Sequence, residues 1–170
     1  MSKEKKKKKI NSKKKGNRNE LEFVKILNST IGEGKNIFSR TPSSGAWGGG
    51  ENRERREDMN IEAKISLVSD VITPIDFKFV LEHKAYNNVS FWDLFNKSSN
   101  FIDWTKQVES DAEFVNKLPM LIMKFDRKKR IVFIKDKFDY YIFEWNGWHC
   151  YWLNDLLEKQ PKDYWFERNK

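Results

Sequence analysis

Cysteine and histidine are scarce in this sequence. Its 170 residues include one cysteine, Cys150, and two histidines. A single cysteine excludes an internal disulfide, and nothing in the pattern suggests a zinc cluster. We therefore expect a protein of a reducing compartment, the cytoplasm.

Long apolar runs are also missing. No segment approaches the ~20 consecutive apolar residues that span a bilayer. The chain starts with many lysines, but no apolar segment follows them, as one would in a secretory signal. We expect neither a membrane-spanning helix nor a secretory signal.

Positive charge is concentrated at the N-terminus. Residues 1–18 hold nine lysines, Arg18 and one acid, Glu4, so they carry +9, whereas the rest of the chain carries −1. Residues 1–16 have low complexity, which predicts a disordered tail. Such a tail can bind nucleic acid by releasing counterions from phosphates, or it can be a solubilising or localisation segment. The charge alone leaves both interpretations open.

The rest of the chain, residues 17–170, predicts one α/β domain with a central mixed sheet flanked by helices. Aromatic residues make up 15% of the sequence, which favours a packed core. The core spans about 17–136, and an aromatic hairpin with a short helix follows in 137–170. The expected elements are a helix over 17–30, strands over 36–40, 61–74 and 76–86, a loop over 41–60, a helical or loop segment over 90–97, a helix over 100–117, strands over 119–126 and 130–136 joined by a basic turn, a hairpin over 140–153 and a helix over 153–160.

One acid of the first expected helix lies on its apolar side. On a helical wheel, Glu20 falls in the middle of the side that carries Phe23, Val24 and Leu27. A carboxylate that faces a core is costly unless a cation, a metal or hydrogen bonds meet it. Either Glu20 serves a site, or the first turn is frayed and leaves it in water.

Two further acids can meet at neighbouring strands. The strand 76–86 places Glu82 and Lys84 on the same face, opposite a buried face that includes His83, and Asp70 lies twelve residues before Glu82. Converging carboxylates suit Mg²⁺ or Mn²⁺, and a nearby lysine can orient or help deprotonate a water. A second Glu-x-Lys, Glu62 and Lys64, follows Asp58 by only four residues, too few for a strand, a turn and another strand, so we reject it.

These residues carry a resemblance to a known family. The pattern Asp70…Glu82-His83-Lys84 resembles the PD-(D/E)xK nuclease superfamily, and more narrowly the archaeal-type Holliday junction resolvases and their phage-encoded relatives. KGNRNELE (15–22) is similar to the family's opening with its first-helix Glu, and FSRTPSSG (38–45) to its Arg- and Ser-containing segment. The likeness covers roughly residues 14–135. Ser69 stands where the superfamily's name has Pro, and the loop between Ser44 and Asp70 is longer than in compact archaeal members.

The resemblance implies a fold, an activity and partners. The fold is a restriction-endonuclease-like core in the order α-β-β-β-α-β. The activity is Mg²⁺-dependent hydrolysis of DNA phosphodiesters, with Mn²⁺ able to substitute, by a homodimer that acts on four-way junctions. Location in the host cytoplasm or nucleoid fits a phage-encoded enzyme. Two alternatives stay open: a related nuclease that cuts another DNA structure, and a noncatalytic protein that binds DNA through its basic tail.

The resemblance also implies roles for single residues. Asp70, Glu82 and the backbone carbonyl of His83 would bind the metal, Glu20 would assist the metal directly or through water, and Lys84 would position the attacking water. The residues implied in DNA contact are Arg40, Ser43 and Ser44 at phosphates, and Lys13, Lys14 and Lys15 in the tail. Gln107 lies at the border of its helix's apolar face, where it either reaches the site or is an ordinary border residue. The His83 ring is expected to be a satisfied core histidine.

Overall fold

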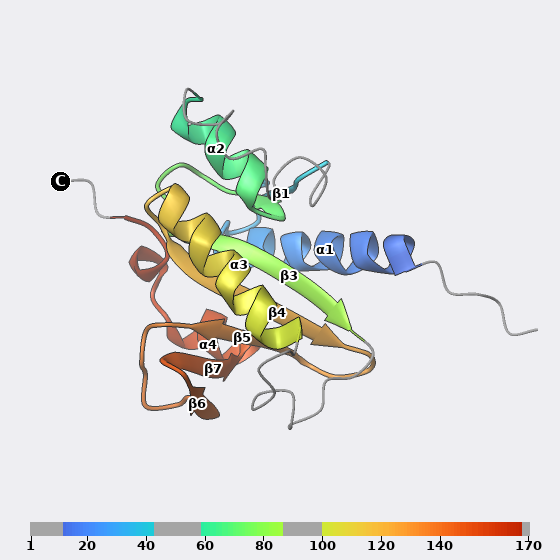
Figure 1. The fold of residues 1–170 in the computed structure, drawn as a ribbon, viewed down its shortest axis with the longest axis vertical. Helices are drawn as coiled ribbons and strands as arrows, with labels where there is room; N and C mark the ends of the chain where they lie inside the picture. The colour runs from blue at the N-terminus through green and yellow to red at the C-terminus, as the bar shows by residue number, and fades with distance from the viewer. Residues whose placement is uncertain (1–11, 43–58, 87–99, 168–170) are drawn as a thin grey trace, which may run out of the picture.

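A five-stranded mixed sheet forms the centre of the computed structural model, which describes residues 12–42, 59–86 and 100–167 (Figure 1). The strand order is β3-β4-β5-β7-β6, in which β3 and β4 run parallel and the other neighbours antiparallel. The strands are β3 (Phe79–Tyr86), β4 (Leu118–Phe125), β5 (Arg130–Ile134), β6 (Phe143–Trp145) and β7 (Trp148–Trp152). This confirms the α/β class and is consistent with the expected restriction-endonuclease-like core.

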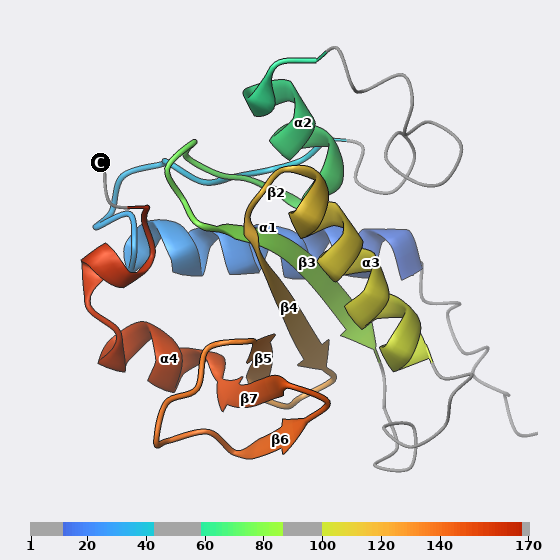
Figure 2. The ribbon, with the colours of Figure 1, turned by 60° about the vertical axis from the view of Figure 1, so that its left-hand side comes forward.

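Helices cover both faces of this sheet (Figure 2). Helices α1 (Ser12–Ser29) and α4 (Leu153–Lys159) pack on one face, in a cluster that includes Phe23, Leu81 and Leu156. Helices α2 (Ile61–Val68) and α3 (Asn100–Phe114) pack on the other, around Val80 and Val108. The strand 76–86 was expected to bury one face only; β3 is instead buried on both, as is usual for parallel strands covered by helices.

The segment 61–74 was predicted to be a strand, and this prediction is wrong. It forms helix α2, followed by the short strand β2 (Val71–Ile72), which pairs antiparallel with β1 (Ser39–Arg40). The β-branched residues of this segment favoured a strand, but Asn60 caps the helix by accepting a hydrogen bond from the Ala63 amide at 2.8 Å. Ile65 and Val68, three residues apart, then face the core on one side of α2.

The first helix begins earlier than predicted. Helix α1 starts at Ser12, not at Asn17, so the last five residues of the expected disordered tail are helical. Lysine is a good helix former, and the apolar side of the helix farther along packs on the sheet. The side chain of Lys13, residues 43–58 with Ser43 and Ser44, and the segment 90–97 lie outside the described part of the chain.

The C-terminal region follows the sequence prediction. Strands β6 and β7 form the expected hairpin, and Asn146 and Gly147 in its turn both have positive φ, 48° and 74°, as a two-residue turn of this kind requires. Helix α4 and the 3₁₀ turn Lys162–Tyr164 complete the described fold. Among the helices that the structure describes, none is both long and apolar enough to cross a bilayer.

Candidate active site

Asp70 reaches β3 through hydrogen bonds. It lies between α2 and β2, and its amide donates to the Leu81 carbonyl at 3.0 Å. Its side-chain Oδ2 accepts a hydrogen bond from the His83 amide at 2.8 Å. Because Glu82 lies between these two partners, the chain brings the two carboxylates of the predicted pair together.

A buried serine fixes this arrangement. The Ser69 hydroxyl donates to the Leu81 carbonyl at 3.0 Å and lies 3.2 Å from the Leu81 amide, from which it accepts. Thr41 holds the segment from the other side, since its hydroxyl donates to the Ser69 carbonyl at 2.7 Å and its amide to the Asp70 carbonyl at 3.1 Å. The backbone on both sides of Asp70 is therefore tied to two neighbouring segments.

Glu82 and Lys84 lie on the same side of β3, as the alternation of a strand predicts. Glu82 is buried, and the Lys84 ammonium forms an ion pair with its Oε1. The same ammonium lies 3.4 Å from the side-chain oxygen of Gln107 on α3. Gln107 therefore reaches the site. The Lys84 side chain is 23% exposed, so its ammonium is accessible to water.

Glu20 enters the site from α1 together with a cation. Its carboxylate lies 2.5 Å from Nε of Arg40 on β1, and Nη2 of Arg40 donates to the Asn17 side chain at 2.9 Å. The helical wheel predicted that Glu20 points inward, and the side chain is only 12% exposed. Arg40, expected at phosphates, here compensates the charge of this acid.

The carboxylates at β3 are hard to ionise. Burial raises the pKa of Asp70 to about 7, helped by the negative charges of Glu82 and Glu20 and opposed by the His83 amide and Lys84. Burial also raises the pKa of Glu82, although Lys84 acts in the opposite direction. Carboxylates that repel one another in a buried place are typical of functional sites.

His83 faces the opposite side of β3, toward α1. Its ring is buried and stacks on Phe23 with the ring centroids 5.5 Å apart. Burial, with the positive charge of Arg130, lowers its pKa to about 3. The core position agrees with the prediction. The ring nitrogens were expected to be hydrogen-bonded, but neither has a partner among the described residues.

The oxygen donors fit a hard divalent cation. Asp70 and Glu82 supply carboxylates, and a bound cation would offset the burial and the neighbouring negative charges that raise both pKa values. Within the described ranges, no group of three or more His, Cys, Asp or Glu side chains is placed to hold a metal. Two carboxylates are enough for a cation such as Mg²⁺, which commonly takes one or two of them and completes its shell with water and substrate phosphates.

The rejected Glu-x-Lys lies in a helix. Glu62 is in the first turn of α2 and is exposed, and Lys64, two residues on, does not share its face. Of the tail lysines whose side chains are described, Lys14 is exposed and Lys15 forms an ion pair with Asp126 at 2.5 Å.

Sequence reasoning missed the residues that position the site. Ser69 acts through hydrogen bonds to the Leu81 backbone, Thr41 through the backbone of Ser69 and Asp70, and Asn17 by accepting from Arg40, and no charge or period marks these three residues. The one available signal was the place of Ser69, directly before Asp70, where the superfamily pattern has proline.

Comparisons with known proteins agree with this geometry at the level of the family. A search of curated proteins found no match, and a search of solved structures found none either. A family model described as "Phage putative PDDEXK endonuclease" matches residues 11–151, and the chain therefore belongs to this family.

Proposed function

We propose that this protein is a Mg²⁺-dependent, structure-selective DNA endonuclease that cleaves four-way junctions as a homodimer. Membership of an endonuclease family indicates a nuclease with DNA as its substrate. The observation that carries the proposal is that Asp70 is hydrogen-bonded to β3 beside Glu82 and Lys84, with raised pKa values at both carboxylates.

Each side chain has a role that its position supports. Asp70 and Glu82 would bind the cation, with the backbone carbonyl of His83 as a further ligand. Such a cation, when bound, polarises the phosphodiester and makes water a better nucleophile. Lys84, which contacts Glu82 and is accessible to water, would hold the attacking water beside them. Glu20 would assist from α1, where Arg40 fixes its carboxylate.

The residues outside this centre would bind the DNA backbone. Arg40 lies next to the site and would contact a phosphate near the cut, together with Ser43 and Ser44. Lys13, Lys14 and Lys15 would add affinity that does not depend on sequence. Gln107 would reach the substrate or the water through its position beside Lys84.

Preference for junctions and the dimer rest on the resemblance of the motifs to the resolvases. A four-way junction is cut symmetrically at two places, and two active sites related by a two-fold axis meet that need. Mn²⁺ is expected to replace Mg²⁺, because both accept carboxylate and water ligands.

The test is cleavage of a synthetic four-way junction beside a linear duplex and a flap of matching sequence, with Mg²⁺ and with EDTA. The variants are Glu82→Gln and its matched control Glu62→Gln, each of which removes one acid from a Glu-x-Lys. We expect paired symmetric nicks on the junction with wild type and with Glu62→Gln, and none with EDTA or Glu82→Gln.

Other outcomes would change the substrate, the class of protein or the choice of Glu-x-Lys. Cleavage of the flap or the duplex in place of the junction would support the proposed active site and contradict the proposed preference for junctions. Tight junction binding with no cleavage under any condition would contradict the enzyme and favour a DNA-binding protein. Loss of activity in Glu62→Gln with full activity in Glu82→Gln would show that the wrong Glu-x-Lys was chosen.

A further inference from the structure

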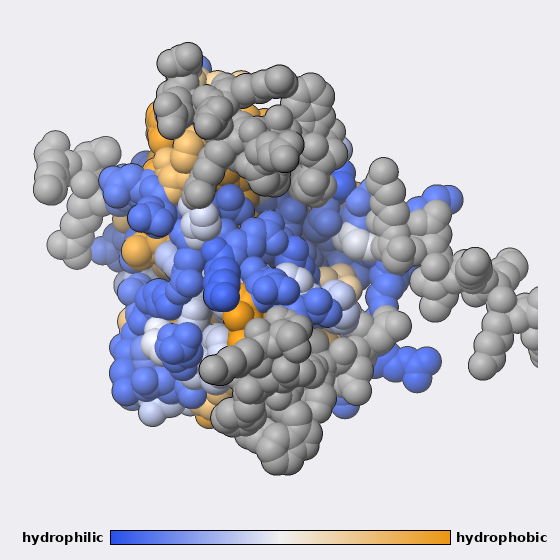
Figure 3. Space-filling model, viewed as in Figure 1, coloured by the Kyte–Doolittle hydropathy of each residue, from blue (hydrophilic) through white to orange (hydrophobic). Residues whose placement is uncertain are grey.

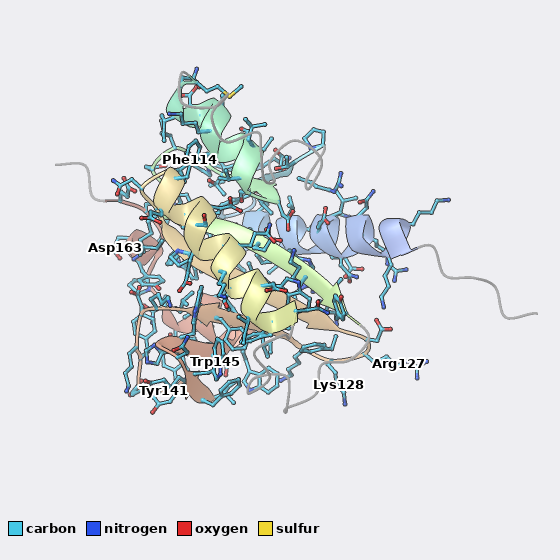
Figure 4. The ribbon with its side chains drawn as sticks, viewed as in Figure 1. Phe114, Arg127, Lys128, Tyr141, Trp145 and Asp163 are labelled. Atoms are coloured by element: carbon cyan, nitrogen blue, oxygen red, sulfur yellow. The ribbon has the colours of Figure 1, made fainter. Side chains whose placement is uncertain are left out.

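The turn between β4 and β5 is the most basic part of the described domain outside α1. Residues 124–130 hold five basic side chains and one acid, in a chain whose residues after 18 carry a net charge of −1. The turn lies near the N-terminal half of α1, and Arg127 and Lys128 stand at its tip (Figure 4). Neither has a side-chain partner among hydrogen bonds and ion pairs of the described residues.

Contacts from two residues, Asp126 and Arg130, fix this turn to the helix that carries Glu20. Asp126 pairs with Lys15 at 2.5 Å, and Arg130 pairs with Glu22 at 3.1 Å and donates to the Asn19 carbonyl at 3.3 Å. Asp126, the one acid within the turn, is thereby engaged by Lys15, and Glu22 offsets the charge of Arg130 at the base of the turn. The tip of the turn keeps its positive charge and a defined place relative to the site.

The backbone at the tip also indicates a use for the side chain. Arg127 has φ +59°, in the left-handed region that costs a residue with a Cβ ~1 kcal/mol or more. Glycine or asparagine would fit this turn with less strain. The arginine keeps a long cationic side chain at the outermost point of the hairpin at the expense of stability.

The sheet register gives the distance between the turn and the site. Glu82 stands opposite Leu121 on β4, and the tip, Asp126 and Arg127, lies five to six residues farther in the direction of both strands. At ~3.3 Å per residue the tip is about 17–20 Å beyond the catalytic carboxylates. Along a DNA duplex this corresponds to about five to six base pairs at ~3.4 Å each.

We propose that the β4–β5 turn and the first turns of α1 form one phosphate-binding surface, which holds a duplex arm about half a helical turn from the scissile phosphate. Charge complementarity selects a nucleic-acid backbone as the occupant, and the rigid spacing to Glu82 selects a duplex that continues beyond the cut. This inference rests on the proposed nuclease function and adds to it the minimum length of the arm. In Figure 3 hydrophilic side chains dominate the middle of the face that carries α3, whereas the apolar area gathers over α2.

The test measures DNA binding in EDTA, so that it does not depend on catalysis. The double variant Arg127→Asn/Lys128→Gln removes two charges, and asparagine tolerates the left-handed backbone at 127. Its matched control, Lys35→Ala/Lys159→Ala, removes two exposed lysines at the opposite end of α1 and on α4. Thermal unfolding confirms that both variants are folded.

We expect the slope of log K against log salt to become shallower by ~1.8 in the double variant, and binding to weaken roughly 10–60-fold at 0.1 M salt. The control should match wild type. Shortening one arm of the substrate to about four base pairs should weaken wild type similarly and leave the double variant almost unchanged. An unchanged slope, or an equal loss in the control, overturns the proposal. If wild type binds as expected but cleaves nothing with Mg²⁺, the proposed function fails while the surface stands.

Discussion

Replacing Asp70 by asparagine is expected to stabilise the metal-free protein more and more as the pH rises. The pKa of Asp70 is raised to about 7 in the folded chain from 3.8, so folding favours the protonated form. The stability that this carboxyl contributes is fully present below pH 3.8 and is lost as the pH rises through 7. Asparagine cannot ionise, and its side-chain oxygen can still accept the His83 amide.

The magnitude follows from the width of this window. Between pH 5 and pH 7 the Asp70 carboxyl is protonated in the folded chain but ionised in the unfolded chain. Over these two pH units the free energy of unfolding changes by ~1.4 kcal/mol per unit, so wild type loses about 3 kcal/mol relative to the variant. His83 works in the opposite direction. Its pKa is lowered from 6.5 to about 3, so folding favours its neutral form, and the stability that it contributes rises with pH up to about 6.5. The raised pKa of Glu82 makes both proteins lose stability as the pH rises. The expectation therefore concerns the difference of about 3 kcal/mol between the two proteins, and not the profile of either one alone.

The assay is urea unfolding of wild type and Asp70→Asn in EDTA at intervals from pH 5 to pH 8. The quantity compared is the difference in free energy of unfolding between the two proteins, which cancels the contribution of His83. Adding Mg²⁺ should raise the free energy of unfolding of wild type most strongly at pH 8, where the Asp70 carboxylate is ionised, and should raise that of the variant less. A difference that does not change with pH would refute the inference that the Asp70 carboxyl holds its proton up to about pH 7.

Two further predictions concern single side chains. Lys84→Ala should keep metal and DNA binding and reduce single-turnover cleavage by at least ~100-fold, because the ammonium proposed to hold the attacking water is lost; unchanged cleavage would remove Lys84 from the mechanism. Ser69→Ala should lower the free energy of unfolding by about 1–3 kcal/mol, because the buried Leu81 amide loses its acceptor, with Ser66→Ala on the exposed side of α2 as the control. Equal stability of the two serine variants would contradict the role given to Ser69.

The candidate site residues were predictable because the chemistry proposed for them leaves marks in the sequence. Alternation along a strand placed Glu82 and Lys84 on one side, and the structure joins their side chains in an ion pair. A helical period placed Glu20 inward, and it is largely buried. Each inference needs only the side-chain period of one strand or one helix, together with a charged residue at a position where that period predicts an apolar one.

The segment before Asp70 was not predictable in the same way. Ile61–Val68 contains β-branched residues that suit a strand, and only the cap at Asn60 and packing against the α3 side of the sheet make it a helix. The expected strand-turn-strand geometry was therefore wrong, although the proximity of Asp70 to Glu82 that it predicted is found. Asp70 reaches β3 through backbone hydrogen bonds and not through a long paired strand.

This local structure explains why serine can stand before Asp70. The Ser69 amide donates to the Ile65 carbonyl at 3.3 Å and closes the end of α2, and φ at Ser69 is −110°. Proline has no amide hydrogen and holds φ near ~−65°, so it would lose this bond and strain the turn. The serine hydroxyl also supplies the link to Leu81 that fixes the backbone beside Asp70. Ser69→Pro, which restores the superfamily's name motif, should consequently destabilise this chain more than Ser69→Ala does.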